Sequence, residues 1–489
     1  MAPELPAVIA TPPVSTPPVS TPAAAEVEAQ RTQVYRRVLQ AIRDGRLAAG
    51  ARLQSARRLA ADWQVARSAV DSALQQLVLE GLVERRVGNG SFVVEQLPTG
   101  TLLLPWATAP SASASASAPA SAPGPSLLHP LQTDTASFPL ATWRRHVARS
   151  YDDSDRACLS YGAPAGLTAL REATARYLRL TRAIDCDPKQ VLIVNSALHA
   201  LELIVQVLLE PGDCVGVEDP GFAAVARVFR QAHLQVVPVP VDDEGFNVDA
   251  AQALAPNAAA LYLHPLNQYP LGCRTSAARR RAVLELANRQ GAWIIEGDNL
   301  AEIVHDGAAP PALWRSDRAE RVLYVGTFNG VTFPSLRLAY LVVPERLVPV
   351  FAAVRGMMGD HSALAPQTAL AAFISSGQLS AHLRTLRALY GQRRGAFISA
   401  VQRHLGDRVR LGPTTAGTHA CLHLPAQHRD TDSVALLARH GIRAEALSAL
   451  CQQNPRPGHN ALVMGYGGDD ELQIEAALQQ AGATLAAAW

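Results

Sequence analysis

The stretch RLQSARRLAADWQVARSAVDSALQQLVLEGLVERRVGNGSFVV, residues 52–94, decides the fold of the N-terminal part of the chain. Apolar residues at helical spacing predict a short helix that ends near Trp63, a turn, and a second helix that starts near Arg67. Two short apolar runs on either side of Gly88-Asn89-Gly90 predict a β-hairpin. A further helix is expected before this stretch, ending at Asp44. Three helices followed by a hairpin predict a winged helix-turn-helix.

Basic residues cluster where this fold would meet DNA. The second helix of a helix-turn-helix enters the major groove by its N-terminal residues, so Arg67 is expected to contact guanine and Ser68 to contact a base or a phosphate. The other candidate DNA contacts are Arg57, Arg58, Arg85, Arg86 and the wing tip Gly88, Asn89 and Gly90. The alternative is a winged helix that binds protein and carries these arginines as a solvated face. Their position favours DNA.

Two low-complexity stretches divide the chain. Residues 1–26, rich in Pro, Ala, Ser and Thr, are expected to form a disordered tail, and residues 97–127 an Ala/Ser/Pro-rich linker. They separate a small module at 27–96 from a large one at 128–489.

The large module alternates apolar runs with helical stretches. This alternation predicts an α/β domain with a mostly parallel sheet, whose strands are buried on both faces. A smaller α+β subdomain is expected from about residue 390 to 489. The predicted strands are Val191–Val194, Cys214–Val217, Ala259–Leu263, Trp293–Ile295, Val322–Val325 and Ala339–Val343.

Composition excludes several classes of protein. The formal net charge of the 489 residues is only +2, so any nucleic-acid surface must be local. Six scattered cysteines indicate neither a metal site nor a disulfide framework, and no membrane span or signal peptide is evident. We therefore expect a cytoplasmic protein. Of the 44 basic Lys and Arg residues, one alone is lysine, Lys189.

The segment from Leu39 to Val94 resembles the GntR-type winged helix. The family pattern GxLxxGxxLPSxRxLA, followed by VSRxTV, EG and GxGxFV, is matched closely, although Gln54 stands where the family has proline. The matching residues include Gly45, Leu47, Gly50, Leu53, Ser55, Arg57, Leu59, Ala60, Val65, Arg67, Val70, Glu80, Gly81, Gly88, Gly90, Phe92 and Val93.

Residues from about 128 onward resemble the fold-type I aminotransferase domain of MocR-type GntR regulators. This resemblance implies pyridoxal 5′-phosphate held by a lysine Schiff base, and homodimers that exchange their DNA-binding modules. The matching stretches are YGAPAGLTALREATARYL (161–178), LLEPGDCVGVEDPGF (208–222), HPLNQYPLG (264–272), VGTFNGVTFPSLRLAYLVVP (325–344) and ISSGQLSAHLRTLRALYGQRR (374–394).

The same resemblance implies a damaged cofactor site. Gly330 occupies the position of the Schiff-base lysine, and Gly297 that of the carboxylate on the pyridine nitrogen, unless a shift of one residue brings Asp298 there. Asn299 replaces the usual tyrosine, and Val463 stands where an arginine binds the substrate carboxylate.

The phosphate end of the implied site is better preserved. Thr327 and Arg337 match phosphate-binding positions, and Asn195, Ser196 and Ala197 open a helix whose N-terminus favours an anion. By the same resemblance Tyr161 is expected to reach the phosphate from the partner subunit, and Phe222 to stack on a ring. The alternative is that Thr327 and Arg337 now only stabilise the fold.

Three functions remain open from the sequence. The first is a DNA-binding regulator whose aminotransferase-like domain dimerises, is catalytically inactive and responds to a phosphate-bearing or amino-acid-like effector. The second is a regulator that still binds pyridoxal phosphate, or another phosphate ligand, without a covalent bond. The third is an active aminotransferase, which the missing lysine disfavours because transamination needs that amine.

Overall fold

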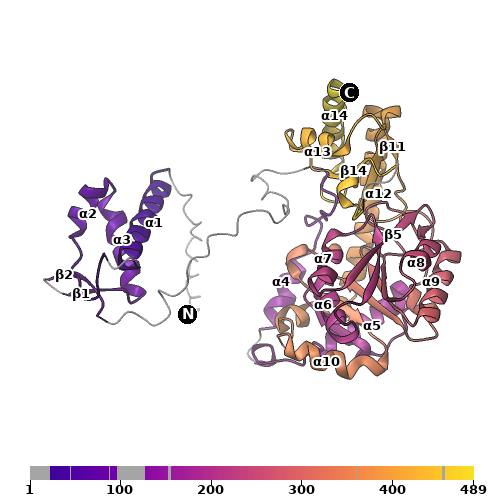
Figure 1. Ribbon diagram of the computed structural model, residues 1–489, viewed down its shortest axis with the longest axis horizontal. Coiled ribbons are helices and arrows are strands. Elements are labelled where there is room, and N and C mark those ends of the chain that lie inside the picture. Colours follow the sequence, from indigo (N-terminus) through magenta and orange to yellow (C-terminus); the bar gives the residue numbers. More distant parts are fainter. Residues whose placement is uncertain are drawn as a thin grey trace, which may run out of the picture. The chain divides into compact units, whose positions relative to one another are not determined.

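The computed structural model describes residues 22–43, 46–86, 89–95, 127–151, 156–359, 361–453 and 458–489. The chain divides into two compact units, Met1–Ser121 and Ala122–Trp489, and each is described by itself (Figure 1). No helix among the described residues is long and apolar enough to cross a membrane.

The first unit is a winged helix-turn-helix, as predicted. Ser55 caps the second helix by accepting a hydrogen bond from the backbone of Arg58, and β1 and β2 pair antiparallel. Val38, Leu74 and Leu77 lie in a core that all three helices share. The elements are α1 Pro22–Arg43, α2 Ala56–Trp63, α3 Arg67–Leu79, β1 Val83–Arg86 and β2 Gly90–Val93.

Helix α1 begins earlier than expected. It starts at Pro22, within the stretch 1–26 that the sequence predicted to be a disordered tail. Proline is favoured in the first turn of a helix, and the three alanines that follow it have the highest helix propensity, which the compositional argument overlooked. Gly88 of the predicted wing tip and most of the predicted linker lie outside the described residues.

The second unit is built on an eight-stranded, mostly parallel sheet in the order β3-β10-β9-β8-β7-β4-β5-β6. This confirms the predicted α/β fold with a mostly parallel sheet, in which β10 runs antiparallel to both of its neighbours and the short β6 runs antiparallel to β5. The strands are β3 Val191–Val194, β4 Cys214–Asp219, β5 Gln235–Asp242, β6 Gly245–Phe246, β7 Ala258–Leu263, β8 Trp293–Asp298, β9 Val322–Thr327 and β10 Ala339–Val342.

Helices cover both faces of this sheet. One face packs against α6, α7 and α10, and the other against α4, α5, α8, α9, α11 and α12. Alternate strand residues enter each core: Leu323 points to the first layer and Tyr324 to the second. The helices are α4 Leu140–Arg149, α5 Thr168–Arg182, α6 Ala197–Leu208, α7 Ala223–Gln231, α8 Val248–Leu254, α9 Ala277–Gln290, α10 Val348–Met357, α11 Leu364–Ser375 and α12 Gln378–His404.

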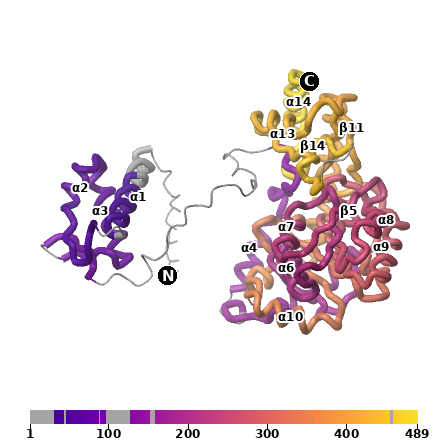
Figure 2. Tube along the Cα trace, in the orientation of Figure 1, coloured from indigo at the N-terminus to yellow at the C-terminus, as the bar shows by residue number. Residues whose placement is uncertain are grey.

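A smaller α+β subdomain completes the second unit, shown in yellow in Figure 2. Its four-stranded antiparallel sheet has the order β11-β12-β14-β13. The segment after residue 126 runs beside it, because Leu127 pairs with Ile442 and the backbone of Leu128 donates to Asp469. The elements are β11 Arg410–Leu411, β12 His419–His423, α13 Asp430–Ala438, β13 Glu445–Ala446, β14 Ala461–Gly465 and α14 Glu471–Ala488.

The core of the winged helix gives a direct test of its packing. Leu77→Ala should cost about 2–5 kcal/mol, because the side chain is fully buried and its removal leaves a cavity. In hydrogen-exchange mass spectrometry of the full chain, amides of α3 should then exchange at least about 30-fold faster. Leu79→Ala on the same helix is the control, because Leu79 is exposed. Equal exchange in the two variants would contradict the packing.

Candidate functional site

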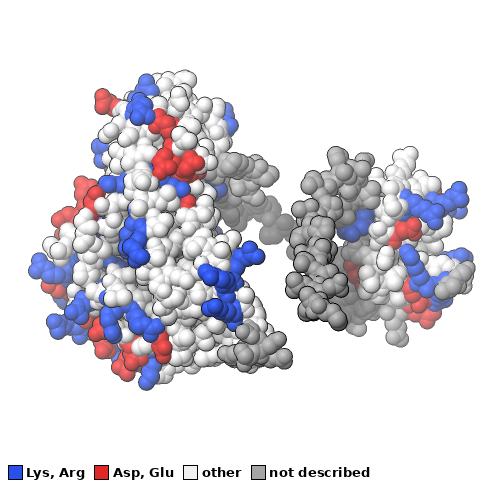
Figure 3. Space-filling view, turned by 180° about the vertical axis from the view of Figure 1, so that it is seen from behind, with Lys and Arg blue, Asp and Glu red and all other residues white. Residues whose placement is uncertain are grey.

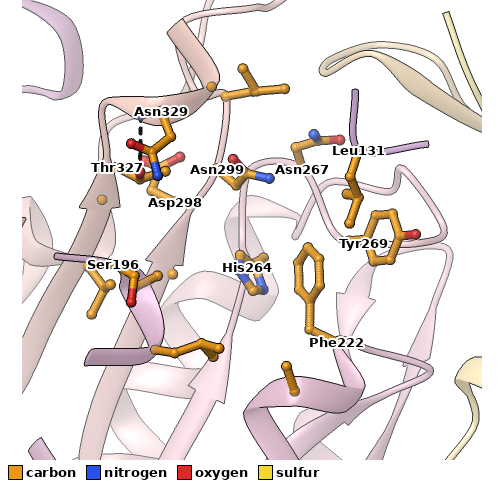
Figure 4. A pocket seen from close by; sticks show the side chains of 18 of the residues that line it. Leu131, Ser196, Phe222, His264, Asn267, Tyr269, Asp298, Asn299, Thr327 and Asn329 are labelled. Atoms are coloured by element: carbon orange, nitrogen blue, oxygen red, sulfur yellow. Dashed lines mark hydrogen bonds between the residues drawn. The ribbon is translucent and has the colours of Figure 1, made fainter. Parts of the chain in front are cut away.

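A cavity of about 380 Å³ opens where β7, β8 and β9 end and α6 begins (Figure 4). Ligands of open α/β sheets bind at this carboxyl edge, where loop residues from several strands converge. The cavity also takes residues from the segment after 127 and from β12 of the smaller subdomain. It therefore lies between the two parts of the second unit.

Most of the predicted ligand residues line this cavity. They are Ser196, Ala197, Phe222, Thr327 and Arg337. Asn195 and Tyr161 do not line it, and the Tyr161 side chain is 87% exposed. The expectation that Tyr161 serves a partner subunit stays a prediction.

One end of the cavity suits an anion. Ser196 caps α6 by accepting a hydrogen bond from the backbone of His199 at 3.1 Å, so the positive end of the helix dipole faces this end. Thr327 accepts from the backbone of Asn329 at 3.2 Å. Arg337 makes no hydrogen bond or ion pair with any part of the chain that the structure describes, and it adopts a left-handed backbone with φ 53°. Its guanidinium is available to a ligand.

Asp298, at the end of β8, is occupied by protein partners. Its Oδ2 atom lies 2.6 Å from Nε of the buried Arg182 and also accepts a hydrogen bond from Tyr324. Burial would lower the pKa of Arg182, but the charge of Asp298 outweighs it and raises that pKa above its usual value. The guanidinium of Arg182 and the carboxyl group of Asp298 thus hold each other inside the protein.

His264 fills the space beside Gly297. A Cβ atom at Gly297 would lie 2.6 Å from Nε2 of His264 and 2.9 Å from the hydroxyl of Tyr262. His264 is buried and bonded on both ring nitrogens, to Tyr262 at 3.1 Å and to Glu218 at 3.4 Å. No side chain longer than hydrogen fits at position 297 unless His264 moves.

Leu300 fills the space beside Gly330 in the same way. A Cβ atom at Gly330 would lie 2.8 Å from Cδ2 of Leu300. Leu300 has φ 58°, a left-handed conformation that costs energy for a residue with a Cβ atom. Its side chain is nevertheless held in this place, over the glycine.

The other end of the cavity is aromatic and holds buried polar atoms without partners. Phe222 stacks on Tyr269 with ring centroids 4.4 Å apart. Oδ1 of Asn267 and Nε2 of His419 are buried and have no hydrogen-bond partner among the described residues. Unpaired buried polar atoms are costly, so a ligand that bonds to them would be stabilised.

Lys189, the single lysine, lies far from the cavity along β3. It is exposed and belongs to the turn before Val191, where β3 begins, whereas Ser196 of the cavity follows the other end of that strand. Four strand residues span about 13 Å.

In the winged-helix unit the predicted DNA contacts are exposed. Arg67 is the first residue of α3 and lies 3.7 Å from Asp71, one turn along. Arg57, Arg58, Ser68, Arg85, Arg86, Asn89 and Gly90 are exposed as well. Acidic residues are mixed with the basic ones, as on both units in the view of Figure 3.

Sequence reasoning missed several residues of both sites. Arg52 and Phe92 are forty positions apart but pair through an isolated β-bridge. The guanidinium of Arg52 lies over the Phe92 ring and beside Gly90 of the wing. His264 follows strand β7, and its place at the carboxyl end of a parallel strand was a usable signal. His419 lies on the smaller subdomain, and nothing in the sequence indicated that it would reach the cavity.

Comparison with known proteins identifies both units. Residues 30–93 match the family described as bacterial regulatory proteins of the gntR family, and residues 131–450 match aminotransferase class I and II. The probable rhizopine catabolism regulatory protein MocR of Rhizobium meliloti is 31% identical over 91% of each chain. The chain belongs to the MocR-type regulators.

A second transcription regulator and a solved structure are also similar to this chain. The pyridoxine biosynthesis transcriptional regulator PdxR of Corynebacterium glutamicum is 30% identical over 90% of this chain and 92% of its own. A kynurenine aminotransferase from Pyrococcus horikoshii matches in structure with a TM-score of 0.68 at 22% identity, covering 75% of this chain and 92% of that one. Its likeness shows the fold alone. The MocR assignment supports a DNA-binding regulator with an aminotransferase-like domain.

Burial of His419 predicts a pH dependence of stability. Desolvation lowers the pKa of its imidazole from 6.5 to about 4. Between these values the unfolded chain binds a proton that the folded chain does not, so stability falls as pH is lowered. Wild type should lose about 2 kcal/mol of unfolding free energy between pH 7 and pH 5 that His419→Gln does not lose.

Urea unfolding of the full chain at both pH values measures this difference. His440→Gln is the control, because His440 is exposed and should leave the pH dependence as in wild type. If His419→Gln and wild type lost the same amount of stability, His419 would not be held neutral by burial.

Proposed function

We propose that this chain is a sequence-specific DNA-binding transcription regulator whose aminotransferase-like domain forms no Schiff base and catalyses no transamination. In this proposal the domain dimerises and binds an effector in the cavity of Figure 4. DNA is reached through α3 and the wing, and the protein acts in the cytoplasm, where the DNA lies.

The position of the chain's one lysine carries this proposal. Pyridoxal phosphate is anchored by a lysine amine, and the same amine moves protons during transamination. Lys189 is exposed at the far end of β3 from the cavity, and Gly330 lines the cavity where we assign the family's lysine. Leu300 lies in the space that a side chain at 330 would enter.

The residues present fit one part of the cofactor and not the others. Ser196, Thr327 and Arg337 suit its phosphate. Its aldehyde meets no amine. Its pyridine nitrogen would need a carboxylate, but position 297 is glycine, His264 fills that space, and Oδ2 of Asp298 is bonded to Arg182. No reaction step through the cofactor follows from this set.

The anion end of the cavity favours a second candidate, a regulator that binds pyridoxal phosphate or another phosphate ligand non-covalently. Arg337 supports it, because its guanidinium lines the cavity and has no partner among the described residues. In this version Phe222 stacks on a ring of the ligand and Tyr161 of the partner subunit completes the phosphate site. The covalent bond is absent in both versions.

We also propose that two chains exchange their DNA-binding units across a homodimer. The Ala/Ser/Pro-rich linker assigned to residues 97–127 is long enough to let the two DNA-binding units exchange. A dimer of this kind recognises two half-sites, with Arg57, Arg58, Arg85 and Arg86 on phosphates and the wing tip close to the backbone.

Arg67 gives the test of DNA recognition. Arg67→Ala should weaken binding to the specific operator by about 1–3 kcal/mol, since a guanidinium contact to guanine is lost. The operator is first selected from random DNA with the wild-type protein, and affinities are then measured by gel-shift titration. The exposed Arg67 has no role in the core, so folding should be unaffected.

Arg384→Ala is the matched control, because it removes one exposed arginine from the other unit. It should bind the operator as wild type does. Operator affinity that is unchanged in Arg67→Ala, or equally reduced in both variants, would reject the assignment.

A further inference from the structure

A second cavity, of about 490 Å³, lies at the first turn of α9, next to the loop over residues 308–316. Three arginines line it, Arg274, Arg280 and Arg281. It shares no lining residue with the cavity over Gly297 and Gly330. It is therefore a separate site on the same unit.

Several guanidinium nitrogens of this second cavity have no acceptor among the described residues. Nε and Nη2 of Arg274 and Nη1 of Arg280 are buried without a hydrogen-bond partner, and Arg281 makes no ion pair within the described residues. Within the described residues, the side chain of Arg280 donates one hydrogen bond, from Nη2 to the carbonyl of Pro311. Each buried donor left unpaired destabilises the protein, so an acceptor that enters the cavity is favoured.

The neighbouring carboxylates do not supply these acceptors. Glu296 of β8 interacts electrostatically with Arg280, but its two oxygens accept from the backbones of Leu313 and Trp314, at 2.9 and 3.2 Å. Asp298 is bonded to Arg182. Burial, together with the like charges of Arg182 and Arg274, lowers the pKa of Arg280, although Glu296 opposes this.

Two further features of the cavity favour an anion. The N-terminus of the fourteen-residue helix α9, capped by Ser276, adds the positive end of its dipole. The hydroxyl of Thr275 is buried at the cavity wall, also without a hydrogen-bond partner among the described residues. Hydroxyl, guanidinium and backbone N–H groups all donate to oxyanions.

We propose that this second cavity binds a small, multiply charged oxyanion, a phosphate or a polycarboxylate, through Arg274, Arg280 and Arg281. Guanidinium groups pair with both of these anions through two parallel hydrogen bonds. The inference does not depend on the function proposed for the first cavity. Arg182 bonds to Asp298 of the first cavity and to the carbonyl of Pro310 in the second, so a test must separate the two.

Calorimetric titration of the full chain separates them in an Arg337→Gln background, which removes the guanidinium of the first cavity. The probes are inorganic pyrophosphate and citrate, each at the same ionic strength set by sodium chloride. At least one probe should bind, and the tighter of the two identifies the class of anion. Arg274→Gln added to this background should weaken that binding about tenfold or more, because charge-assisted hydrogen bonds are lost.

Arg289→Gln is the matched control, because it removes an arginine from the last turn of the same helix, outside the cavity. It should leave the affinity unchanged. Failure of both probes to bind, or equal affinity with and without Arg274, would overturn the proposal.

Thermal melting without the probes excludes a merely structural role for Arg274. Without a bound anion, the buried charge of Arg274 is unpaired and destabilises the protein. Arg274→Gln should therefore melt at or above the wild-type temperature in chloride buffer. The probe that binds should raise the melting temperature of the Arg337→Gln chain and leave that of the double variant nearly unchanged. A lower melting temperature for Arg274→Gln in chloride would contradict the site.

Discussion

The buried ion pair between Arg182 and Asp298 fixes the centre of the second unit. It ties the last turn of α5 to the end of β8, and the hydroxyl of Tyr324 on β9 bonds to the same carboxylate. Removal of one partner from such a pair typically costs 3–5 kcal/mol, because the other charge is left buried alone. Because the ion pair fixes Asp298, it also positions the residues that follow. One of them is Leu300, whose side chain lies over Gly330.

Two glycines, and the neighbouring side chains that fill the space beside them, determine the shape and polarity of the cavity. His264 lies beside Gly297 and Leu300 beside Gly330, so the space is closed by neighbours and was not left as a hole. In the proposed assignment, Gly297 and Gly330 stand at the positions of the ring-nitrogen carboxylate and of the anchoring lysine. The cavity then has an anion end at Ser196 and Arg337 and an aromatic end, where Oδ1 of Asn267 and Nε2 of His419 have no hydrogen-bond partner in the part of the chain that the structure describes. Such a cavity is suited to hold a ligand by hydrogen bonds alone.

The sequence predicted most of the fold because the strongest signals are local. Strand β3 has the predicted bounds, and the winged helix follows from apolar spacing and its turn residues. Strand β5 was missed because it contains Pro238 and Pro240, which argue against a central strand. Among the described residues, the strand partner on its other edge, β6, pairs with Val241 and Asp242, so no strand there needs the N–H that Pro238 and Pro240 lack. The antiparallel course of β10 depends on tertiary pairing and has no signature in its residues.

The site was less predictable than the fold. Positions fixed by motifs, such as Thr327 and Arg337, do line the cavity, whereas Asn195, the residue after β3, does not line it. The residues that set the cavity's polarity come from distant segments: His264 follows β7, and His419 lies on a strand that reaches the cavity from the other subdomain. No local pattern shows that a histidine will occupy the space that a glycine thirty-three positions away leaves open.

Peptide mapping by mass spectrometry tests directly whether the protein forms a Schiff base with pyridoxal phosphate. Wild type and the lysine-free variant Lys189→Arg are incubated with pyridoxal phosphate, reduced with borohydride and digested, and both are titrated with the operator. If no Schiff base forms, wild type carries no stoichiometric coenzyme adduct, and the two proteins bind the operator with equal affinity. A stoichiometric adduct on wild type, absent from Lys189→Arg and accompanied by loss of operator binding in that variant, would contradict this prediction.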